Sequence, residues 1–507
     1  MSFVQNFPCF SIVLCMASGI ISTPLKGKGA KRVTLFVVSL AALLSFATLL
    51  YIISTGTGFT YTMGRFPAPW GNELRAGLLE SLLVTVFSLV VLCSLLGGMD
   101  LIFTDVAEDK VNLYFILVDL LLSSLLAILY TNDLFTAYVF VEINTISTCG
   151  LIMIRESGRS LIAATRYMVM SLIGSGLFLI SIAMLYGVTG NLLMEYIHVE
   201  ILELAASGQY QVPLLVIISF CTVGLAIKSG LYPFHSWMPD AYGYATISSS
   251  AILSSLVSKS YIFLLIKFFY RVISFDLIVQ SKIVNVLFVF GLIGMIMGSV
   301  SAIMAKEIYR MIAYSSVAQI GYIYMGIGLA TEAGMVAAVF HILTHAVTKS
   351  LLFLSAKGLN EASGRKRVYP ALQGAAFRNP LAGAAFLIGS LSMVGIPTLA
   401  GFISKLLFAT AVIDGSQRKL LPTLIVLAIS TILNTIYFLH TVVRIYTPVG
   451  APEEYKDVRI HPTLGRIGAL VALILMNFGL GLFSQPITDL IRAGIEMLSG
   501  LGNSTYN

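Results

Sequence analysis

The sequence contains little charge. Only 11% of its 507 residues are Asp, Glu, Lys or Arg, whereas charged residues make up about 25% of a typical soluble domain. Hydrophobic residues account for 57%, and the mean hydropathy is +0.92. A soluble protein of this length needs far more polar surface. The composition therefore excludes a soluble enzyme, a nucleic-acid-binding protein and a disordered protein, and it indicates an integral membrane protein.

Cysteine is also scarce, and the common cofactor motifs are missing. The five cysteines lie within apolar runs and form no CxxC pair, so we interpret them as packing residues rather than disulfides or metal ligands. No haem-type CxxCH, cluster-type cysteine run or dinucleotide-binding glycine pattern occurs, so we expect no cofactor in this chain. The first residues lack a positive region, so no cleavable signal peptide is expected.

Long apolar runs dominate the remainder and predict an all-α polytopic membrane protein. Each run is close to the ~20 residues that a helix needs to cross a bilayer. The stretch 191–211 is too short and too acidic to cross, so it is expected to lie along the surface. Fourteen spans are predicted, at about 8–24, 33–53, 78–99, 112–130, 134–154, 163–187, 213–231, 247–270, 283–304, 309–330, 333–356, 381–412, 420–443 and 465–484.

The distribution of basic residues predicts the orientation. The net charge is +7, and most Lys and Arg residues fall on alternate loops, which are assigned to the cytoplasmic side. This places both termini outside, in the cell membrane of a prokaryote. Lys267, near the end of the eighth span, is expected to extend to the membrane surface. Lys357 is assigned to the loop after the eleventh span.

Six ionisable residues fall inside the predicted spans. A charge at the centre of a bilayer costs at least ~2.5–3.5 kcal/mol, so such residues face a protein interior and mark ion pathways. They are Asp119, Glu142, Lys228, Lys259, Lys349 and Lys405.

Two spans carry proline beside one of these lysines. Pro233 follows Lys228 in the seventh span, and Pro397 precedes Lys405 in the twelfth. Each proline removes a backbone donor and breaks its helix. Interrupted helices at matching positions indicate inverted repeats, here spans 4–8 and 9–13. The predicted divisions are 1–110 (three helices), 111–275 and 276–445 (the repeats), and 446–507 (last span and tail).

Three polar residues form a stripe along the eleventh span. His341, His345 and Lys349 are spaced i, i+4, i+8 and therefore share one face of a helix. Histidine titrates near neutral pH, so such a column can relay protons. A zinc pair is the alternative, but neither an HExxH motif nor a third ligand is visible, and no metal site is expected.

Long motifs over nearly the whole chain resemble the antiporter-like subunits shared by respiratory complex I, Mrp-type Na+/H+ antiporters and membrane-bound hydrogenases. They are NDLFTAYVFVE (132–142), KSGLYPFHSWMPDAY (228–242), AKEIYRMIAYSSVAQIGY (305–322), HILTHAVTKSLLFL (341–354) and GIPTLAGFISKLLF (395–408). Lysine rather than glutamate at position 405 and a short C-terminal tail make the D subunit of Mrp antiporters the most similar type.

The resemblance implies a role for each matching residue. Glu142 would pair with Lys228, Lys259 would be the central lysine, and Lys405 would be the terminal lysine near an exit. His341, His345 and Lys349 would link the last two, and His235 is an accessory candidate within its motif. Asp119 does not belong to the family pattern, so it is a second accessory candidate, either an ion ligand or the partner of a lysine.

The sequence as a whole therefore predicts a subunit that moves H+, and in an antiporter also Na+, inside a complex of several membrane subunits. The chain has no catalytic redox site of its own, although its complex could be an oxidoreductase. Two alternatives stay open at this point: a scaffolding or quinone-contacting subunit of a redox enzyme, and a freestanding secondary transporter. The expected partners are other membrane subunits and lipid, with no nucleic acid.

Overall fold

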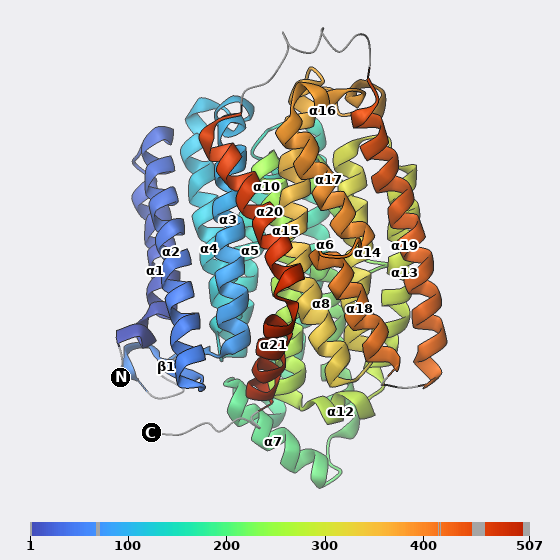
Figure 1. The fold of residues 1–507 in the computed structure, drawn as a ribbon. Helices are drawn as coiled ribbons and strands as arrows, with labels where there is room; N and C mark the ends of the chain where they lie inside the picture. Colours follow the sequence, from blue (N-terminus) through green and yellow to red (C-terminus); the bar gives the residue numbers. More distant parts are fainter. Residues whose placement is uncertain (1–2, 67–70, 414, 416, 449–461, 500–507) are drawn as a thin grey trace.

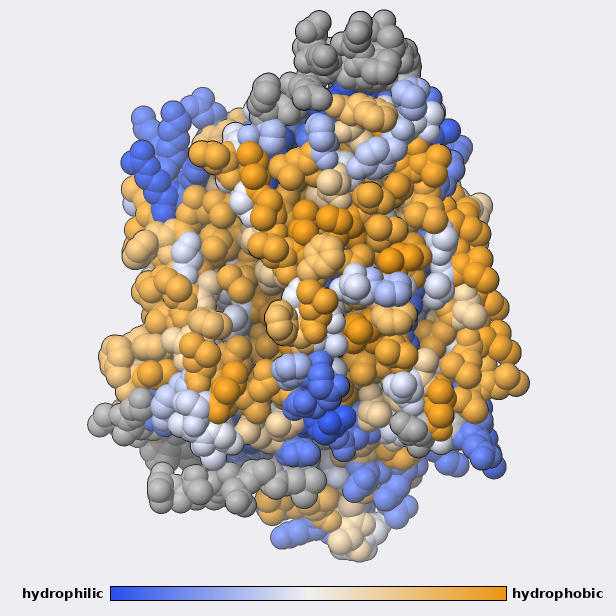
Figure 2. Space-filling model, viewed as in Figure 1, coloured by the Kyte–Doolittle hydropathy of each residue, from blue (hydrophilic) through white to orange (hydrophobic). Residues whose placement is uncertain are grey.

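The computed structural model describes residues 3–66, 71–413, 415, 417–448 and 462–499. The chain forms a bundle of helices that run side by side (Figure 1). Within the described part, 12 helices are long and apolar enough to cross a membrane. Apolar side chains form a broad band around the bundle, with hydrophilic residues gathered towards its two ends (Figure 2). These features confirm the prediction of a helical, multi-pass membrane protein.

The N-terminal part adds a small hairpin that the sequence did not predict. Two strands, β1 (Phe59–Thr62) and β2 (Glu73–Ala76), pair antiparallel, with Phe59 opposite Ala76. They cap the lower end of the bundle between α2 and α3 (Figure 1). The elements around them are η1 (Phe3–Asn6), α1 (Phe7–Ser22), α2 (Gly27–Thr55), η2 (Met63–Arg65) and α3 (Leu78–Asp105).

The middle of the chain contains the stretch expected at the surface. It forms α7 (Met194–Ala206), which projects from the lower end of the bundle (Figure 1). Its 13 residues are too few to cross a bilayer. The elements on either side are η3 (Glu108–Lys110), α4 (Val111–Tyr130), α5 (Leu134–Met153), α6 (Gly158–Thr189), α8 (Gln211–Ser229) and α9 (Met238–Tyr244).

The next span is not a uniform α-helix. It runs from Ile247 to Ile273 as α10 (Ile247–Ile252), a π-helical segment η4 (Leu253–Val257), α11 (Ser258–Lys267) and a second π-helical segment η5 (Phe268–Ile273), followed by α12 (Phe275–Gln280). π-Helical turns are rare and often mark functional sites. This span and α15 (Glu332–Ala362) lie wholly inside the protein.

The last part of the chain surrounds α15. It comprises α13 (Ile283–Met304), α14 (Ile308–Gly328), η6 (Tyr369–Leu372), α16 (Ala375–Arg378), α17 (Pro380–Val394), α18 (Ala400–Ile413), α19 (Gln417–Tyr446), α20 (Leu464–Leu482) and α21 (Ser484–Leu498). α13 and α14 approach very closely, because a Cβ on Gly321 would lie 2.6 Å from the carbonyl oxygen of Gly291.

Both expected interruptions are present. α8 ends at Ser229, before Pro233, and the chain resumes a helix only at Met238. α17 ends at Val394, and α18 begins at Ala400, after Pro397. Gly230 and Gly395, which follow the two helix ends, have φ of 76° and 93°, a conformation that glycine adopts without strain. Each break leaves helix-terminal carbonyls available to side chains within the bundle.

Candidate functional site

The first group of expected residues lies where α8 ends. Lys228 is buried, and its Nζ donates a hydrogen bond of 2.6 Å to Oγ1 of Thr145 on α5. The same Nζ lies 5.7 Å from the centre of the Tyr261 ring on α11. Three helices therefore meet at this ammonium, and the nearest oxygen ligand is a neutral hydroxyl.

Glu142 lies one turn before Thr145 on α5. Its Oε1 is buried and has no hydrogen-bond partner. The carboxylate interacts electrostatically with Lys228, yet no ion pair joins the two within the described residues. The structure thus brings the two residues into the same region with Thr145 between them.

Lys259 occupies the centre of the bundle, directly after the first π-helical segment. Its side chain has no exposed surface, and its Nζ donates to the carbonyl of Ser254 in that segment. It interacts electrostatically with Lys349 and His345 on α15. The widened π-helical turn provides the backbone acceptor, which explains how a buried lysine is satisfied here without an acid.

The polar stripe on α15 is present as a column. Lys349 donates to the Ile312 carbonyl at 2.9 Å and to Oγ of Ser315, both on α14. The rings of His345 and His341 have centroids 6.1 Å apart and planes inclined by 23°. Neither nitrogen of His345 has a partner within the described residues. A buried histidine whose two nitrogens are both free can accept a proton on one and release one from the other.

The column continues to the second helix break. Nδ1 of His341 lies 2.5 Å from Oγ of Ser404, the residue before Lys405 on α18. Lys405 donates to the Val394 carbonyl at 2.7 Å and to Oγ1 of Thr431 at 3.1 Å. Its Nζ also lies 5.9 Å from the centre of the Tyr322 ring, which stacks on His341. His341 and Lys405 are therefore connected through two intermediaries.

The partners of these groups share one property that matters for their chemistry. Each buried lysine is held by backbone carbonyls or hydroxyls, which are uncharged. Losing the lysine's proton therefore leaves no unpaired carboxylate, whose burial would be costly. Such an arrangement can exchange protons between neighbouring groups. No group of three His, Cys, Asp or Glu side chains able to hold a metal ion occurs in the described ranges.

The two accessory candidates lie elsewhere. Asp119 is buried, and its Oδ2 accepts hydrogen bonds from Ser18 on α1 at 2.6 Å and Thr34 on α2 at 2.8 Å. Asp119 thus lies among the N-terminal helices, and its hydrogen-bond partners are hydroxyls rather than a lysine. His235 lies in the link between α8 and α9, with its ring stacked on Tyr232 at 5.1 Å.

Two lysines are not where the sequence was expected to place them. Lys267 does not reach the membrane surface: it has no exposed surface and donates to the carbonyls of Leu129 at 3.0 Å and Thr131 at 2.5 Å. The unpaired carbonyls at the end of α4 satisfy its ammonium inside the protein. Lys357 is not in a loop, because α15 continues to Ala362 and buries it. Its spacing of eight residues from Lys349 was the signal available in the sequence.

Comparison with known proteins agrees with this geometry. Residues 131–433 match the family described as "NADH:quinone oxidoreductase/Mrp antiporter, TM". The chain belongs to this family. The matched region contains every member of the series from Glu142 to Lys405.

Relatives of this NADH:quinone oxidoreductase/Mrp antiporter family span most of the chain. NADH-quinone oxidoreductase subunit N of Desulforudis audaxviator is 30% identical over 446 residues, covering 85% of this chain and 86% of the relative. The putative antiporter subunit mnhD2 of Staphylococcus epidermidis is 29% identical over 474 residues, covering 92% and 90%. These identities do not separate the complex I type from the Mrp type.

A solved structure shows the same fold. The Mrp complex from Dietzia sp. contains a chain with a TM-score of 0.86, with 98% of each chain covered and 24% sequence identity. At this identity the likeness shows the architecture alone.

Proposed function

We propose that the chain is a proton-translocating membrane subunit of a multi-subunit complex of the Mrp antiporter, complex I or membrane-bound hydrogenase type. The observation that carries the proposal is the series of buried basic groups from Lys228 to Lys405, each held by neutral oxygen atoms. The relatives are named as subunits of larger assemblies, which supports neighbouring membrane subunits as partners.

In this proposal a proton moves along the series in steps. Lys228 takes up a proton while ionised Glu142 stabilises its ammonium, and it releases the proton towards Lys259 when that influence weakens. Lys259 passes the proton to the α15 stripe at Lys349, and His345 and His341 carry it to Lys405. Water in the bundle completes the gaps between side chains, as it does in other buried polar networks. Na+ exchange is included in the proposal because an antiporter subunit is among the relatives.

The membrane arrangement forms part of the proposal. Adding α14 and the interrupted pair α17–α18 to the 12 candidate spans gives fourteen crossings. The proposed inverted repeats are 111–273 and 283–446. In support, the interrupted helix occupies the fourth place in each, and a lysine lies beside each break. Both termini would lie outside a prokaryotic cell membrane, and Asp119 and His235 would be accessory to the path.

Replacing Lys259 with methionine tests the proposed function. The residue has no exposed surface and no acidic hydrogen-bond partner, so Lys259→Met keeps the packing and removes the central proton carrier. We expect the assembled complex to lose proton transport in native membrane vesicles, measured with a pH-sensitive dye. Lys282→Met, at an exposed turn before α13, is the matched control. Normal transport by an assembled Lys259→Met complex would favour a scaffolding role instead.

A further inference from the structure

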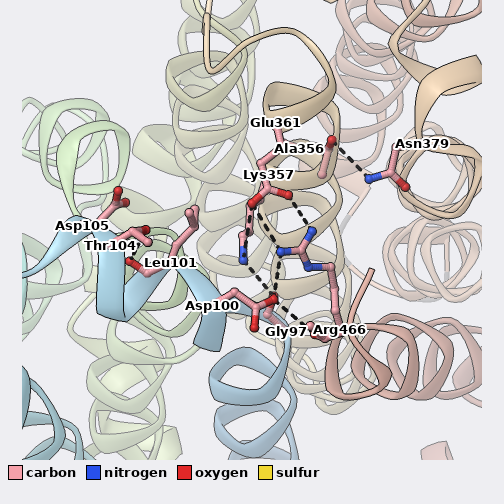
Figure 3. A network of polar contacts seen from close by, with 12 residues as sticks. Gly97, Asp100, Leu101, Thr104, Asp105, Ala356, Lys357, Glu361, Asn379 and Arg466 are labelled. Atoms are coloured by element: carbon pink, nitrogen blue, oxygen red, sulfur yellow. Dashed lines mark hydrogen bonds and ion pairs between the residues drawn. The ribbon is translucent and has the colours of Figure 1, made fainter. Parts of the chain in front are cut away.

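Four charged side chains converge at the end of the bundle that carries α16 (Figure 3). Arg466 of α20 contacts Glu361 of α15 at 2.5 and 3.3 Å and Asp100 of α3 at 3.0 Å. Lys357, one turn before Glu361, completes the group. The cluster joins three helices, and it is separate from the series between Lys228 and Lys405.

Exposure decreases steadily across this cluster. The side chain of Asp100 is 40% exposed, that of Glu361 17%, and that of Lys357 0%. The cluster therefore connects a carboxylate in contact with water to an ammonium that water does not reach. An acid at the surface next to a buried base is the arrangement needed for proton uptake.

Lys357 is held more weakly than its neighbour. Its Nζ lies 3.4 Å from the carbonyl of Gly97 and 4.0 Å from Oε1 of Glu361, whereas Arg466 makes three shorter contacts with the two carboxylates. Arg466 is ionised at all working pH values and can satisfy both acids. Lys357 can then lose or gain its proton without leaving a carboxylate unpaired. Asp105 on α3, which pairs with Arg155 at 3.7 Å, is the other charged group that acts on it.

The position of Lys357 on α15 links the cluster to the proton path. It follows Lys349 by eight residues, about 12 Å along the same face of the helix. Hydroxyls of Ser350 on α15 and Ser94 on α3 hydrogen-bond at 2.9 Å beside Lys349. Gly97, whose carbonyl accepts from Lys357, lies one turn beyond Ser94. Polar groups of α3 and α15 therefore lie at intervals between the two lysines.

We propose that Asp100, Glu361 and Lys357 form a proton inlet that feeds Lys349 from the α16 end, without using Glu142 or Lys228. A proton from water binds the carboxylate of Glu361 or Asp100 and passes to the neutral amine of Lys357, which restores the carboxylate. The resulting ammonium gives the proton to Lys349 through water and the serine hydroxyls. Arg466 is a positioning residue that keeps both carboxylates in place. This inference rests on the proposed function, because Lys349 must itself carry protons.

The competing explanation is a static ionic cluster that only fastens α20 to α3 and α15. Both explanations expect damage when charge is removed, but they differ for a substitution that keeps it. Lys357→Arg preserves the positive charge and the donor towards Gly97, so a static cluster tolerates it. A proton inlet does not, because arginine does not release its proton.

The experiment compares four variants in native membrane vesicles that contain the assembled complex. We expect Lys357→Met and Lys357→Arg each to slow proton transport by about tenfold or more, as losing a general acid–base group does. Lys110→Met removes a surface ion pair with Glu156 near the same end of α3 and should leave the rate unchanged. Lys349→Met tests the path itself and should abolish transport.

The outcomes separate the two levels of the argument. A normal rate for Lys357→Arg overturns the inlet, and so does a normal rate for Lys357→Met when Lys349→Met is inactive. Normal transport by Lys349→Met contradicts the proposed function instead. If Lys357→Met does not assemble, the Lys357→Arg variant decides alone, since a slow but assembled arginine variant supports the inlet.

Discussion

Lys405 on α18 donates a hydrogen bond to the carbonyl of Val394, the last residue of α17, across the break between the two helices. The Nζ–O distance is 2.7 Å. A carbonyl at a helix end has no partner within its helix and carries part of the negative end of the helix dipole. The protonated lysine therefore fastens the two halves of the broken span, and its deprotonation weakens that link.

Substituting Lys405 tests whether its proton must leave. We expect Lys405→Ala to abolish proton transport, and Lys405→Arg to fail to restore it, because arginine keeps the charge and the donor but not the exchangeable proton. The measurement is dye-monitored proton transport in vesicles with equal amounts of assembled complex. Lys419→Arg is the control, since Lys419 also donates to a helix-end carbonyl, that of Gly328 at 2.7 Å. Wild-type transport by Lys405→Arg would leave only a fixed-charge role.

Thr145 should matter because it supplies the hydrogen bond to Lys228. Thr145→Val keeps the shape and removes the hydroxyl, and a hydrogen bond to a charged group contributes about 1.5–3 kcal/mol. We expect transport to fall by about tenfold or more, which corresponds to 1.4 kcal/mol. Thr145→Ser retains the hydroxyl and should keep most of the rate. Equal rates for the valine and serine variants would show that this contact is dispensable.

Asp119 is expected to serve the packing of the N-terminal helices. Asp119→Asn retains an oxygen that can accept from Ser18 and Thr34, so thermal stability in detergent should change little. Asp119→Leu leaves both hydroxyls without an acceptor, at a cost of about 1–3 kcal/mol each, and should lower Tm. If Asp119→Asn instead abolished Na+-dependent transport at normal Tm, Asp119 would be an ion ligand.

The attachment of α7 should depend on pH through His198. Burial lowers the pKa of His198 below its ordinary value of 6.5, opposed by the Val272 carbonyl and the charge of Glu195. The folded state then binds a proton less readily than the unfolded segment, so stability is full above pH 6.5 and decreases as the pH falls below it. Hydrogen exchange of α7 amides should become faster at pH 5.5 than at pH 7.5, and His198→Gln should remove this difference.

The sequence was sufficient to predict the features set by spacing and by proline. The interruptions near Pro233 and Pro397 follow from the missing backbone donor, and the α15 column follows from the i, i+4 spacing of His341, His345 and Lys349. These features depend on one helix at a time, so no knowledge of its neighbours was needed.

The partners of the buried lysines could not be predicted in the same way. Lys267 reaches the carbonyls of Leu129 and Thr131, and Lys259 reaches that of Ser254. Backbone carbonyls exist at every position, so composition does not reveal which ones become available. The choice depends on where α4 ends and where the span of Lys259 widens into π-helix, and tertiary packing determines both.

The close crossing of α13 and α14 limits where the protein can change shape. With no room for a methyl group between Gly291 and Gly321, the two backbones interlock and cannot slide past each other. They act as a stiff beam beside Lys349, whose partners Ile312 and Ser315 belong to that beam. Any rearrangement during a transport cycle must then be borne by the short hinges at Gly230 and Gly395, so a disulfide engineered across the beam should leave turnover intact and one across either hinge should arrest it.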